Sequence, residues 1–239
     1  MRGEDFTISI YNKHSILIQF HFEIDENNVD LLLFYKRIIL EKYPQLILQV
    51  INTYNSLLVI YVTTINKIYR QKESLKSLIL NRQSIPDIQS RILEIPVCYH
   101  EEFGLDLDLI SKENNLEISD ISKLHSAKKY RVFFIGFLPG FPYLSHVDSR
   151  LEINRKKEPR AAIEKGSVGI AGLQTGIYPE SSPAGWQIIG RTPLQLFDEV
   201  KRQSLLKAGD YLKFKPIDKK QFEEIEERVF HDAYTVKIK

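Results

Sequence analysis

The stretch that decides the fold spans residues 136–190 and reads GFLPGFPYLSHVDSRLEINRKKEPRAAIEKGSVGIAGLQTGIYPESSPAGWQIIG. It holds eight of the chain's eleven glycines, five of its ten prolines and its only tryptophan. Glycine permits positive φ angles and close backbone approach, whereas proline fixes φ and removes an N–H donor. Several aromatic residues lie between these bends: Phe137, Phe141, Tyr143, Tyr178 and Trp186. We expect this stretch to form the walls and floor of a recognition groove.

Short strand-like segments surround and include this stretch. They are YRVFFIGF, SVGIAG, GWQIIG, LQLF and YLKFKPI, all between residues 130 and 217. Many short strands divided by turn signals predict a β-barrel or sandwich. RILEIPVCY (91–99) precedes them as a strand, followed by two short helices over 105–114 and 117–127, the second capped by Ser119. Residues 219–230 read as a helix because apolar residues recur three and four positions apart, and AYTVKI (233–238) reads as a last strand.

The first ninety residues have a different pattern. Strands are predicted over 6–11, 15–20, 45–54 and 56–64, with helices over 26–42 and 72–82. This order predicts a small α+β sandwich with its helices on one face of the sheet. The short polar segment Ser84-Ile85-Pro86-Asp87 is the best domain boundary. We therefore predict an α+β domain over 1–86 and a mainly β barrel domain over 87–239.

Composition limits the kinds of partner. Charged residues make up 27% of the chain and the formal net charge is only +2, which does not predict a nucleic-acid partner. A single cysteine, Cys98, excludes an intramolecular disulfide and fits a reducing compartment. The N-terminal residues turn acidic where a secretory signal would turn apolar, and no apolar run approaches the roughly 20 residues that span a bilayer. We expect a soluble cytoplasmic protein without membrane or nucleic-acid partners.

Common catalytic motifs are missing from the sequence. It contains no GxxxxGK[ST] phosphate loop, no dinucleotide fingerprint, no GxSxG elbow, and neither HExxH nor CxxC. Cys98 and His100 can point to one face of a strand, but two groups do not make a zinc site. We predict no metal site and assign no bound cofactor to this chain.

Two arginines are the best candidate anion ligands. Arg160 follows a proline and Arg191 lies just before one, both in tight segments, and a guanidinium pairs bidentately with carboxylate or phosphate. The alternative for each is a structural salt bridge. Gln174 and Thr175 lie between two glycines, where a loop can form an anion-binding nest or simply a hairpin corner.

The aromatic residues Phe141, Tyr143, Tyr178 and Trp186 can supply an apolar wall for a small flat lactam or a proline ring. The alternative is that they belong to the barrel core, because large aromatic side chains are commonly buried. All four are predicted ligand-binding residues.

His125 precedes the first glycine-rich strand and is the candidate for proton transfer. The alternative is a histidine that only occupies a surface or core position on its helix. Asp106 and Asp108 lie near a helix start, where capping explains them.

Four segments carry a family resemblance: IPVCYHEEFGLDLD, LHSAKKYRVFFIGFLPGFPYL, GSVGIAGLQTGIYPESSPAGWQIIGRTPLQLFD and AGDYLKFKPI. Together they resemble the KipI/allophanate hydrolase subunit 1 family, whose prokaryotic members are mostly described as the B subunit of 5-oxoprolinase. The resemblance implies a cyclophilin-like β-barrel behind a small α+β domain. It also implies two partners, a sister subunit of the allophanate hydrolase subunit 2 type and a third oxoprolinase subunit. Such a complex opens the ring of 5-oxo-L-proline to give L-glutamate, with ATP as co-substrate.

Two positions depart from the family pattern. Ala184 stands where the family usually has the first glycine of PGGW, so the loop before Trp186 is expected to differ in shape, since alanine disfavours positive φ. His100 stands where a small residue is common.

Three functions remain open at this point. The first is a subunit of an ATP-dependent amidohydrolase, active only in complex and with its ATP chemistry largely on another subunit. The second is an inhibitor of a sensor histidine kinase, which a branch of the family is described as being, through a proline-binding groove. The third is a stand-alone prolyl isomerase, which rests on fold analogy alone.

Overall fold

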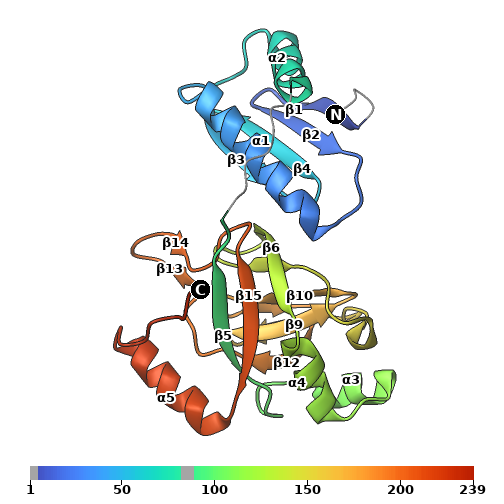
Figure 1. Cartoon of the computed structure of the whole chain (residues 1–239), viewed down its shortest axis with the longest axis vertical. Coiled ribbons are helices and arrows are strands. Elements are labelled where there is room, and N and C mark those ends of the chain that lie inside the picture. Colours follow the sequence, from blue (N-terminus) through green and yellow to red (C-terminus); the bar gives the residue numbers. More distant parts are fainter. Residues whose placement is uncertain (1–4, 82–88) are drawn as a thin grey trace. The chain divides into compact units, whose positions relative to one another are not determined.

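The computed structural model describes residues 5–81 and 89–239. The chain forms two compact units, Met1–Gln89 and Ser90–Lys239, and each is described by itself (Figure 1). The predicted boundary at Ser84–Asp87 lies outside the described residues.

The first unit is an antiparallel sheet of four strands in the order β1-β2-β4-β3, with two α-helices. In β2 the alternating residues Ile16, Ile18 and Phe20 are fully buried. The ring of Phe20 stacks on that of Tyr35 in α1, with centroids 5.6 Å apart. Every second side chain of β2 thus points to the same face of the sheet, and this is the face that α1 covers. The elements are β1 (Phe6–Asn12), β2 (Ser15–Phe20), a 3-10 turn (Glu26–Asn28), α1 (Val29–Lys42), β3 (Ile47–Asn52), β4 (Ser56–Tyr61) and α2 (Ile68–Leu80).

The start of α2 differs from the prediction. The helix begins at Ile68 rather than Lys72, because Ile68 packs against the core of this unit. The predicted last residue, Arg82, lies outside the described residues.

The second unit is a closed barrel with strand order β10-β7-β6-β15-β5-β12-β9, which agrees with the barrel predicted from the sequence. The neighbours β15 and β5 run parallel, and every other barrel pair is antiparallel. The barrel strands are β5 (Ile92–Cys98), β6 (Lys129–Ile135), β7 (Pro142–Leu144), β9 (Ser167–Ala171), β10 (Gln174–Ile177), β12 (Gln187–Arg191) and β15 (Tyr211–Ile217). Two short pairs lie outside it: β8 (Arg160–Ile163) with β11 (Ser182–Ala184), and β13 (Phe197–Asp198) with β14 (Gln203–Ser204).

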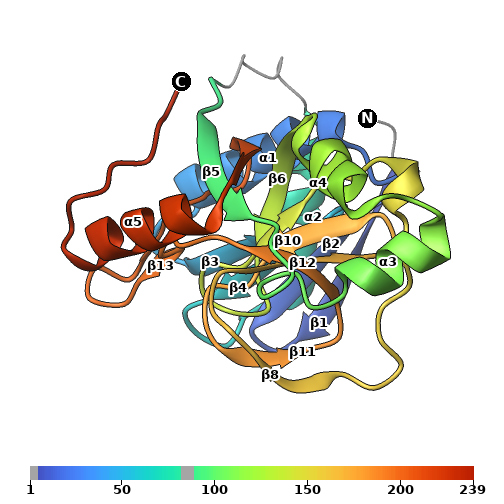
Figure 2. The same ribbon diagram turned by 90° about the horizontal axis from the view of Figure 1, so that it is seen from below.

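The barrel interior is filled by branched and aromatic side chains such as Ile95, Val132, Ile170 and Phe214. Three α-helices pack around it: α3 (Leu107–Asn114), α4 (Ile118–Ser126) and α5 (Lys219–Phe230), with a 3-10 turn at Ser149–Leu151. The helix α4 packs against β15. The helix α5 packs against β5 (Figure 2). A capping box between Asp218 and Gln221 fixes the start of α5 at the predicted residue.

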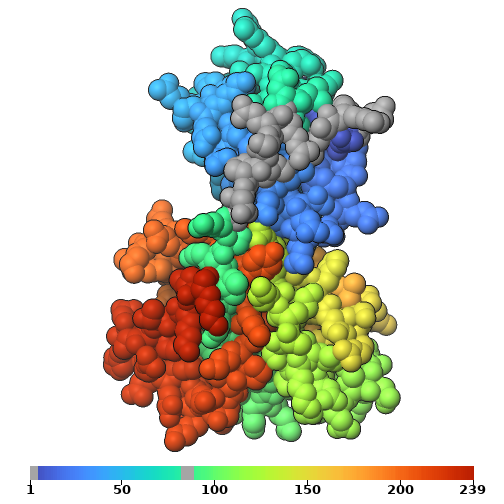
Figure 3. Space-filling model, in the orientation of Figure 1, coloured from blue at the N-terminus to red at the C-terminus, as the bar shows by residue number. Residues whose placement is uncertain are grey.

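Three local predictions were wrong. The N-cap of α4 is Glu117, not Ser119, so Ser119 lies inside the helix. In LQLF only Phe197 enters a strand. AYTVKI forms no regular strand, although a single bridge joins Ile238 to Leu93 in β5. Figure 3 shows the dark red end of the chain beside the green segment that contains β5.

Within residues 5–81 and 89–239, no helix has both the length and the apolar character to cross a bilayer.

Candidate functional site

The glycine-rich stretch brings four predicted ligand-binding residues into one aromatic cluster: Phe141, Tyr143, Tyr178 and Trp186. The ring of Phe141 lies 5.0 Å from Tyr178 and 5.5 Å from Trp186, both in edge-to-face geometry. Tyr143 lies 5.0 Å from Phe141 and 6.0 Å from Trp186. Edge-to-face pairs of this kind add to the stabilisation from burial. Phe141 and Tyr178 are buried, whereas Tyr143 and Trp186 are half-buried, so this cluster has both a packed base and an accessible side.

A glycine and an alanine allow the aromatic cluster to close. A Cβ at Gly176 would lie 2.9 Å from the Phe141 ring, so a larger residue there would displace the ring. Ala184 is buried among the aromatic residues, on β11, and its φ is not positive. Alanine in place of the family's glycine is therefore compatible with the strand conformation at residue 184. Its methyl group packs within the aromatic cluster.

Phe137 projects from the loop between β6 and β7 in an unusual conformation. Its φ is 68°, a left-handed value that is unfavourable for a bulky residue, and 65% of the residue is exposed. Its ring meets Phe141 edge-on at 5.7 Å and Tyr178 at 6.5 Å. Strained residues concentrate at functional sites. The loop thus presents an aromatic ring to solvent next to the aromatic cluster.

One cation lies beside the aromatic cluster. A Cβ at Gly185 would lie 2.8 Å from the guanidinium of Arg155, which places that group against the backbone before Trp186. Burial raises the pKa of Tyr178 to about 12, and burial raises the pKa of Tyr143 as well, with Arg155 opposing both shifts. Both phenols are therefore neutral at physiological pH. The result is an uncharged aromatic surface with an exposed positive group at its edge.

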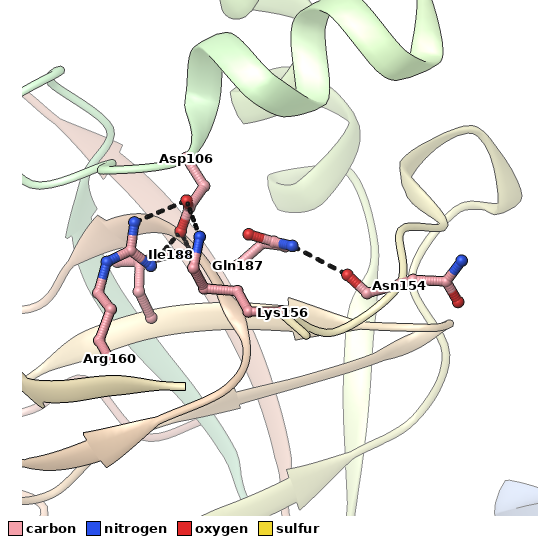
Figure 4. A network of polar contacts seen from close by, with 6 residues as sticks. All are labelled: Asp106, Asn154, Lys156, Arg160, Gln187 and Ile188. Carbon is pink, nitrogen blue, oxygen red and sulfur yellow. Dashed lines mark hydrogen bonds and ion pairs between the residues drawn. The ribbon is translucent and has the colours of Figure 1, made fainter. Parts of the chain in front are cut away.

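A buried carboxylate, Asp106, organises the neighbouring polar network (Figure 4). Arg160 donates to both of its oxygens, at 2.8 and 2.7 Å, and the Lys156 ammonium lies 3.3 Å away. The backbone N–H of Ile188 donates to the same carboxylate at 2.7 Å. Asp106 occupies the N-cap position of α3 but makes no side-chain capping bond, so the predicted capping role was wrong. The backbone amide it binds belongs to β12, not to the helix that it begins.

The charge state of this network is fixed. Burial alone would raise the pKa of Asp106, but the hydrogen bonds from Arg160 and Ile188 and the nearby positive charges outweigh it, so the pKa is lowered. The pKa of Arg160 is raised by its hydrogen bond to Asp106. Arg160 is thus already paired with an internal carboxylate, which is the structural alternative considered for it. Its role as a ligand-binding residue stays a prediction.

The segment Ala184–Ile188 joins this network to the aromatic cluster. The side chain of Ile188 packs with the aromatic residues while its N–H binds Asp106. Gln187, which lies between Trp186 and Ile188 in the sequence, donates from Nε2 to the carbonyl of Asn154 at 2.9 Å (Figure 4). A change in the Asp106 network would therefore move the backbone that carries Trp186.

His125 lies in a buried chain of hydrogen bonds rather than on the surface. Its Nδ1 is 2.7 Å from the Tyr99 hydroxyl, and its Nε2 is 2.9 Å from the Thr175 hydroxyl. Thr175 donates its own proton to the carbonyl of Gly169, at 2.9 Å. The Thr175 oxygen must then accept from His125, which assigns the proton to Nε2 and leaves Nδ1 to accept from Tyr99.

Burial lowers the pKa of His125 to about 3, so the ring is neutral near pH 7. It also stacks on Phe214, with centroids 4.3 Å apart. This geometry fits the alternative of a core histidine, and proton transfer by His125 stays a prediction. Thr175 is likewise buried, whereas Gln174 is half-buried at the start of β10. These two predicted ligand residues do not share an accessible surface.

Arg191 lies apart from the aromatic cluster, at the contact between the barrel and α5. Its guanidinium is 4.5 Å from the ring centre of Phe103 and 4.8 Å from that of Phe222, and it pairs with Glu226 at 3.5 Å. The adjoining cavity of about 890 Å³ is lined by more carboxylates than cations. Both observations favour the structural alternative for Arg191 over anion binding.

Sequence reasoning missed three features of this region. Arg155 belongs to no motif, and the importance of Asp106 depends on partners that are 50 to 82 positions away. The left-handed conformation of Phe137 had one available signal, its place between Gly136 and the Pro139-Gly140 turn.

The chain matches the carboxyltransferase domain family, subdomains C and D, over residues 6–206. It belongs to this family. It is 48% identical to the 5-oxoprolinase B subunit of Bacillus subtilis (strain 168) over 137 residues, which is 57% of this chain and 57% of the relative. The Escherichia coli O157:H7 protein of the same name is 45% identical over 129 residues, 54% of this chain and 59% of the relative. The match thus spans less than two thirds of these relatives. The resemblance drawn from the sequence motifs is confirmed.

Two of the solved structures that resemble the chain illustrate the likeness. One is a conserved uncharacterized protein, PH0987 from Pyrococcus horikoshii, with 39% identity and a TM-score of 0.53, covering 90% of this chain and all of that one. The other is the K. lactis urea amidolyase, with a TM-score of 0.80 over 98% of this chain and 16% of that one. At 19% identity, the second likeness concerns the fold alone.

Proposed function

We propose that this chain is a non-autonomous subunit of an ATP-dependent 5-oxoprolinase complex that converts 5-oxo-L-proline to L-glutamate. The observation that carries the proposal is its 45–48% identity to proteins named as the B subunit of 5-oxoprolinase. The partners would be a sister subunit of the allophanate hydrolase subunit 2 type and a third oxoprolinase subunit. Together they would break the lactam C–N bond at the expense of ATP.

The charge states of the site support a binding role over proton transfer. Asp106 is held as a carboxylate, His125 as a neutral imidazole, and Tyr178 as a neutral phenol. A general acid or base works best with a pKa near the operating pH. These groups are therefore suited to holding and orienting a ligand, while proton transfer and ATP chemistry fall to the partners.

The aromatic cluster also suits the proposed substrate. A lactam ring is small and flat, and the half-buried faces of Tyr143 and Trp186 offer apolar area for it. The nearby guanidinium of Arg155 has the charge that a carboxylate requires.

The test is ATP-dependent glutamate release from 5-oxoproline. We expect turnover with the two partner subunits present and none with any one of the three subunits left out. Robust turnover by this chain alone, or an unchanged rate when it is omitted, would overturn the proposal.

Inhibition of a sensor histidine kinase is the second candidate, favoured by the exposed ring of Phe137 beside the aromatic cluster. A protein segment that carries proline could dock there. Its test is kinase autophosphorylation with and without this chain, where a Phe137→Ala variant should lose the inhibition.

A further inference from the structure

The four-stranded sheet of the first unit has two edge strands, β1 and β3. Natural proteins protect such edges from pairing with other chains by charged residues, proline or bulges. In β3 a bulge does this, because its register with β4 shifts between Ile47 and Gln49. The register of β1 with β2 is regular over residues 6–10, and its sequence, FTISIYN, contains neither a charged residue nor a proline. β1 is therefore the unprotected edge of this sheet.

The hydrogen bonds between β1 and β2 show which backbone groups of β1 face outward. The N–H of His21 donates to the carbonyl of Asp5 at 2.9 Å, so these two residues form a hydrogen-bonded pair. In an antiparallel ladder such pairs recur at every second residue. The odd-numbered residues of β1 thus bond to β2, and the N–H and C=O groups of Phe6, Ile8 and Ile10 point away from it. Within residues 5–81 and 89–239, these outward groups make no hydrogen bond.

The side chains of β1 leave part of an apolar row uncovered. Phe6 and Ile8 lie in the core of this unit and are 4% and 8% exposed, whereas Ile10 on the same face is 38% exposed. Thr7 and Ser9 are exposed on the other face of the sheet. A strand added at this edge would therefore extend both the hydrogen-bonded ladder and the core.

The sequence of β1 is complementary to itself in antiparallel pairing. When Ile8 lies opposite Ile8 of another copy, Phe6 of each copy lies opposite Ile10 of the other. The outward backbone groups of these residues then meet as hydrogen-bonded pairs. Thr7 lies opposite Ser9 on the open face. Each copy thus covers the exposed Ile10 of the other with an aromatic ring, a favourable cross-strand pair.

The charges at the two ends of β1 favour the same orientation. Asp5 precedes the strand and Lys13 follows it in the turn to β2, and both are exposed. Antiparallel pairing brings the acidic end of one copy to the basic end of the other, twice in each dimer. Parallel pairing of two β1 strands would instead bring like charges together at both ends, which is destabilising.

We propose that β1 pairs antiparallel with β1 of a second copy of this chain, about a two-fold axis at Ile8, so that two four-stranded sheets become one continuous sheet. The occupant is a second copy because the apolar pairs and the terminal charges of β1 both match β1 itself. An interface of this kind closes on itself, so it gives a dimer and not a fibre. The pairing does not rest on the proposed function. It places two copies of this chain, and so two aromatic clusters, in one assembly.

The first test is the mass of the full chain in solution, measured by sedimentation equilibrium over a range of concentrations. We expect a monomer–dimer equilibrium. A chain that stays monomeric at every concentration, or that forms open-ended oligomers, overturns the proposal.

Amide hydrogen exchange, read residue by residue, then locates the contact. The amides of Phe6, Ile8 and Ile10 should exchange slowly in the dimer and rapidly in the monomer, whereas those of Thr7 and Ser9 bond to β2 and should change little. A dimer in which the amides of residues 6, 8 and 10 stay fast forms through another surface and overturns the proposal. Protection that appears only when the proposed partner subunits are added also overturns it.

A pair of charge variants tests the register. Thr7 and Ser9 are exposed, so charged side chains are compatible with the fold at both positions. Thr7→Lys with Ser9→Lys places lysine opposite lysine across the dimer and should raise its Kd about ten-fold or more. Thr7→Lys with Ser9→Glu places opposite charges at the same positions and should keep the Kd within about three-fold of that of the original chain. Equal Kd values for the two double variants would overturn the proposed pairing.

The variants are matched in their other effects. Both lose the contact between Thr7 and His21, so a difference between them reports the cross-strand charges alone. Gln49→Lys adds an exposed lysine to the opposite edge of the same sheet and should leave the Kd unchanged. Thermal unfolding shows whether each variant is folded. If a double variant does not fold, the exchange of residues 6, 8 and 10 in the unaltered chain decides the question.

Discussion

Asp106 and Arg160 lie 54 positions apart and form a bidentate ion pair in which both carboxylate oxygens accept from one guanidinium. The carboxylate is buried and also accepts from the N–H of Ile188, so the pair connects the start of α3 with β8 and β12. This carboxylate therefore ties the start of α3 to two strands of the glycine-rich stretch.

Replacing Arg160 by alanine should destabilise the second unit by about 2 kcal/mol, because it leaves a buried carboxylate with one weaker cation and one N–H donor. Arg160→Lys should cost less, since it keeps the charge and loses the bidentate geometry. Denaturant unfolding measures both. If Arg160→Ala leaves stability unchanged but raises the KM of the complex, Arg160 is a ligand-binding residue, as the sequence alone suggested.

The buried state of His125 predicts a pH dependence of stability. Its pKa is about 3 in the folded chain and about 6.5 when unfolded, so between these values the unfolded state binds more protons. The stability that depends on a neutral His125 is therefore fully present above pH 6.5. It is lost as the pH falls toward the folded pKa of about 3.

Within this pH window, the titration of His125 should make the free energy of unfolding fall by about 1.4 kcal/mol per pH unit as the pH decreases. Comparison with His125→Gln isolates it, because the variant has no titrating ring and should show a shallower fall in stability as the pH drops below the unfolded pKa of 6.5. Identical slopes in the two proteins would mean that the ring is solvated and free to titrate.

Arg191→Ala should lower the melting temperature and release α5, because the guanidinium lies against the rings of both Phe103 and Phe222. The expected loss is about 1 kcal/mol. Limited proteolysis at residues 219–230 should accelerate in parallel. Loss of complex activity with unchanged melting and proteolysis would instead show that Arg191 contacts a ligand.

Phe137→Gly should separate stability from assembly. Glycine relieves the left-handed strain, worth about 1 kcal/mol, so this variant should be at least as stable as Phe137→Ala. Both variants should bind the partner subunits more weakly, since both lose the exposed ring. Pull-down and thermal unfolding measure the two effects. Full partner binding by both variants would remove Phe137 from the contact.

Local patterns predicted the elements of the fold well. The run SILIQF is short and rich in β-branched and aromatic residues and forms β2, as predicted, and the spacing of Phe222, Ile225 and Val229 predicted both ends of α5. The glycines of residues 136–190 predicted close backbone approach, and Gly176 leaves room for the Phe141 ring. The recognition groove expected from this stretch stays a prediction.

Long-range pairings were not predictable in the same way. Nothing near Asp106 in the sequence indicates that its partners are Arg160 and Ile188, and the capping rule led to the wrong interpretation. Likewise, an arginine close to a proline looks the same whether it meets a ligand or two phenylalanine rings, as Arg191 does. The helices and strands follow from the local periodicity of apolar residues. The partners of the charged groups are decided only when the barrel closes and brings distant segments together.

On the proposed function, the glycine-rich aromatic site is the surface through which this chain contacts its partner subunits. Hydrogen exchange on mixing with the sister subunit, read together with the fluorescence of Trp186, tests it most directly. We expect exchange to slow most within residues 136–190 and the Trp186 signal to shift. Slowing confined to the first ninety residues, with an unchanged Trp186 signal, would contradict it.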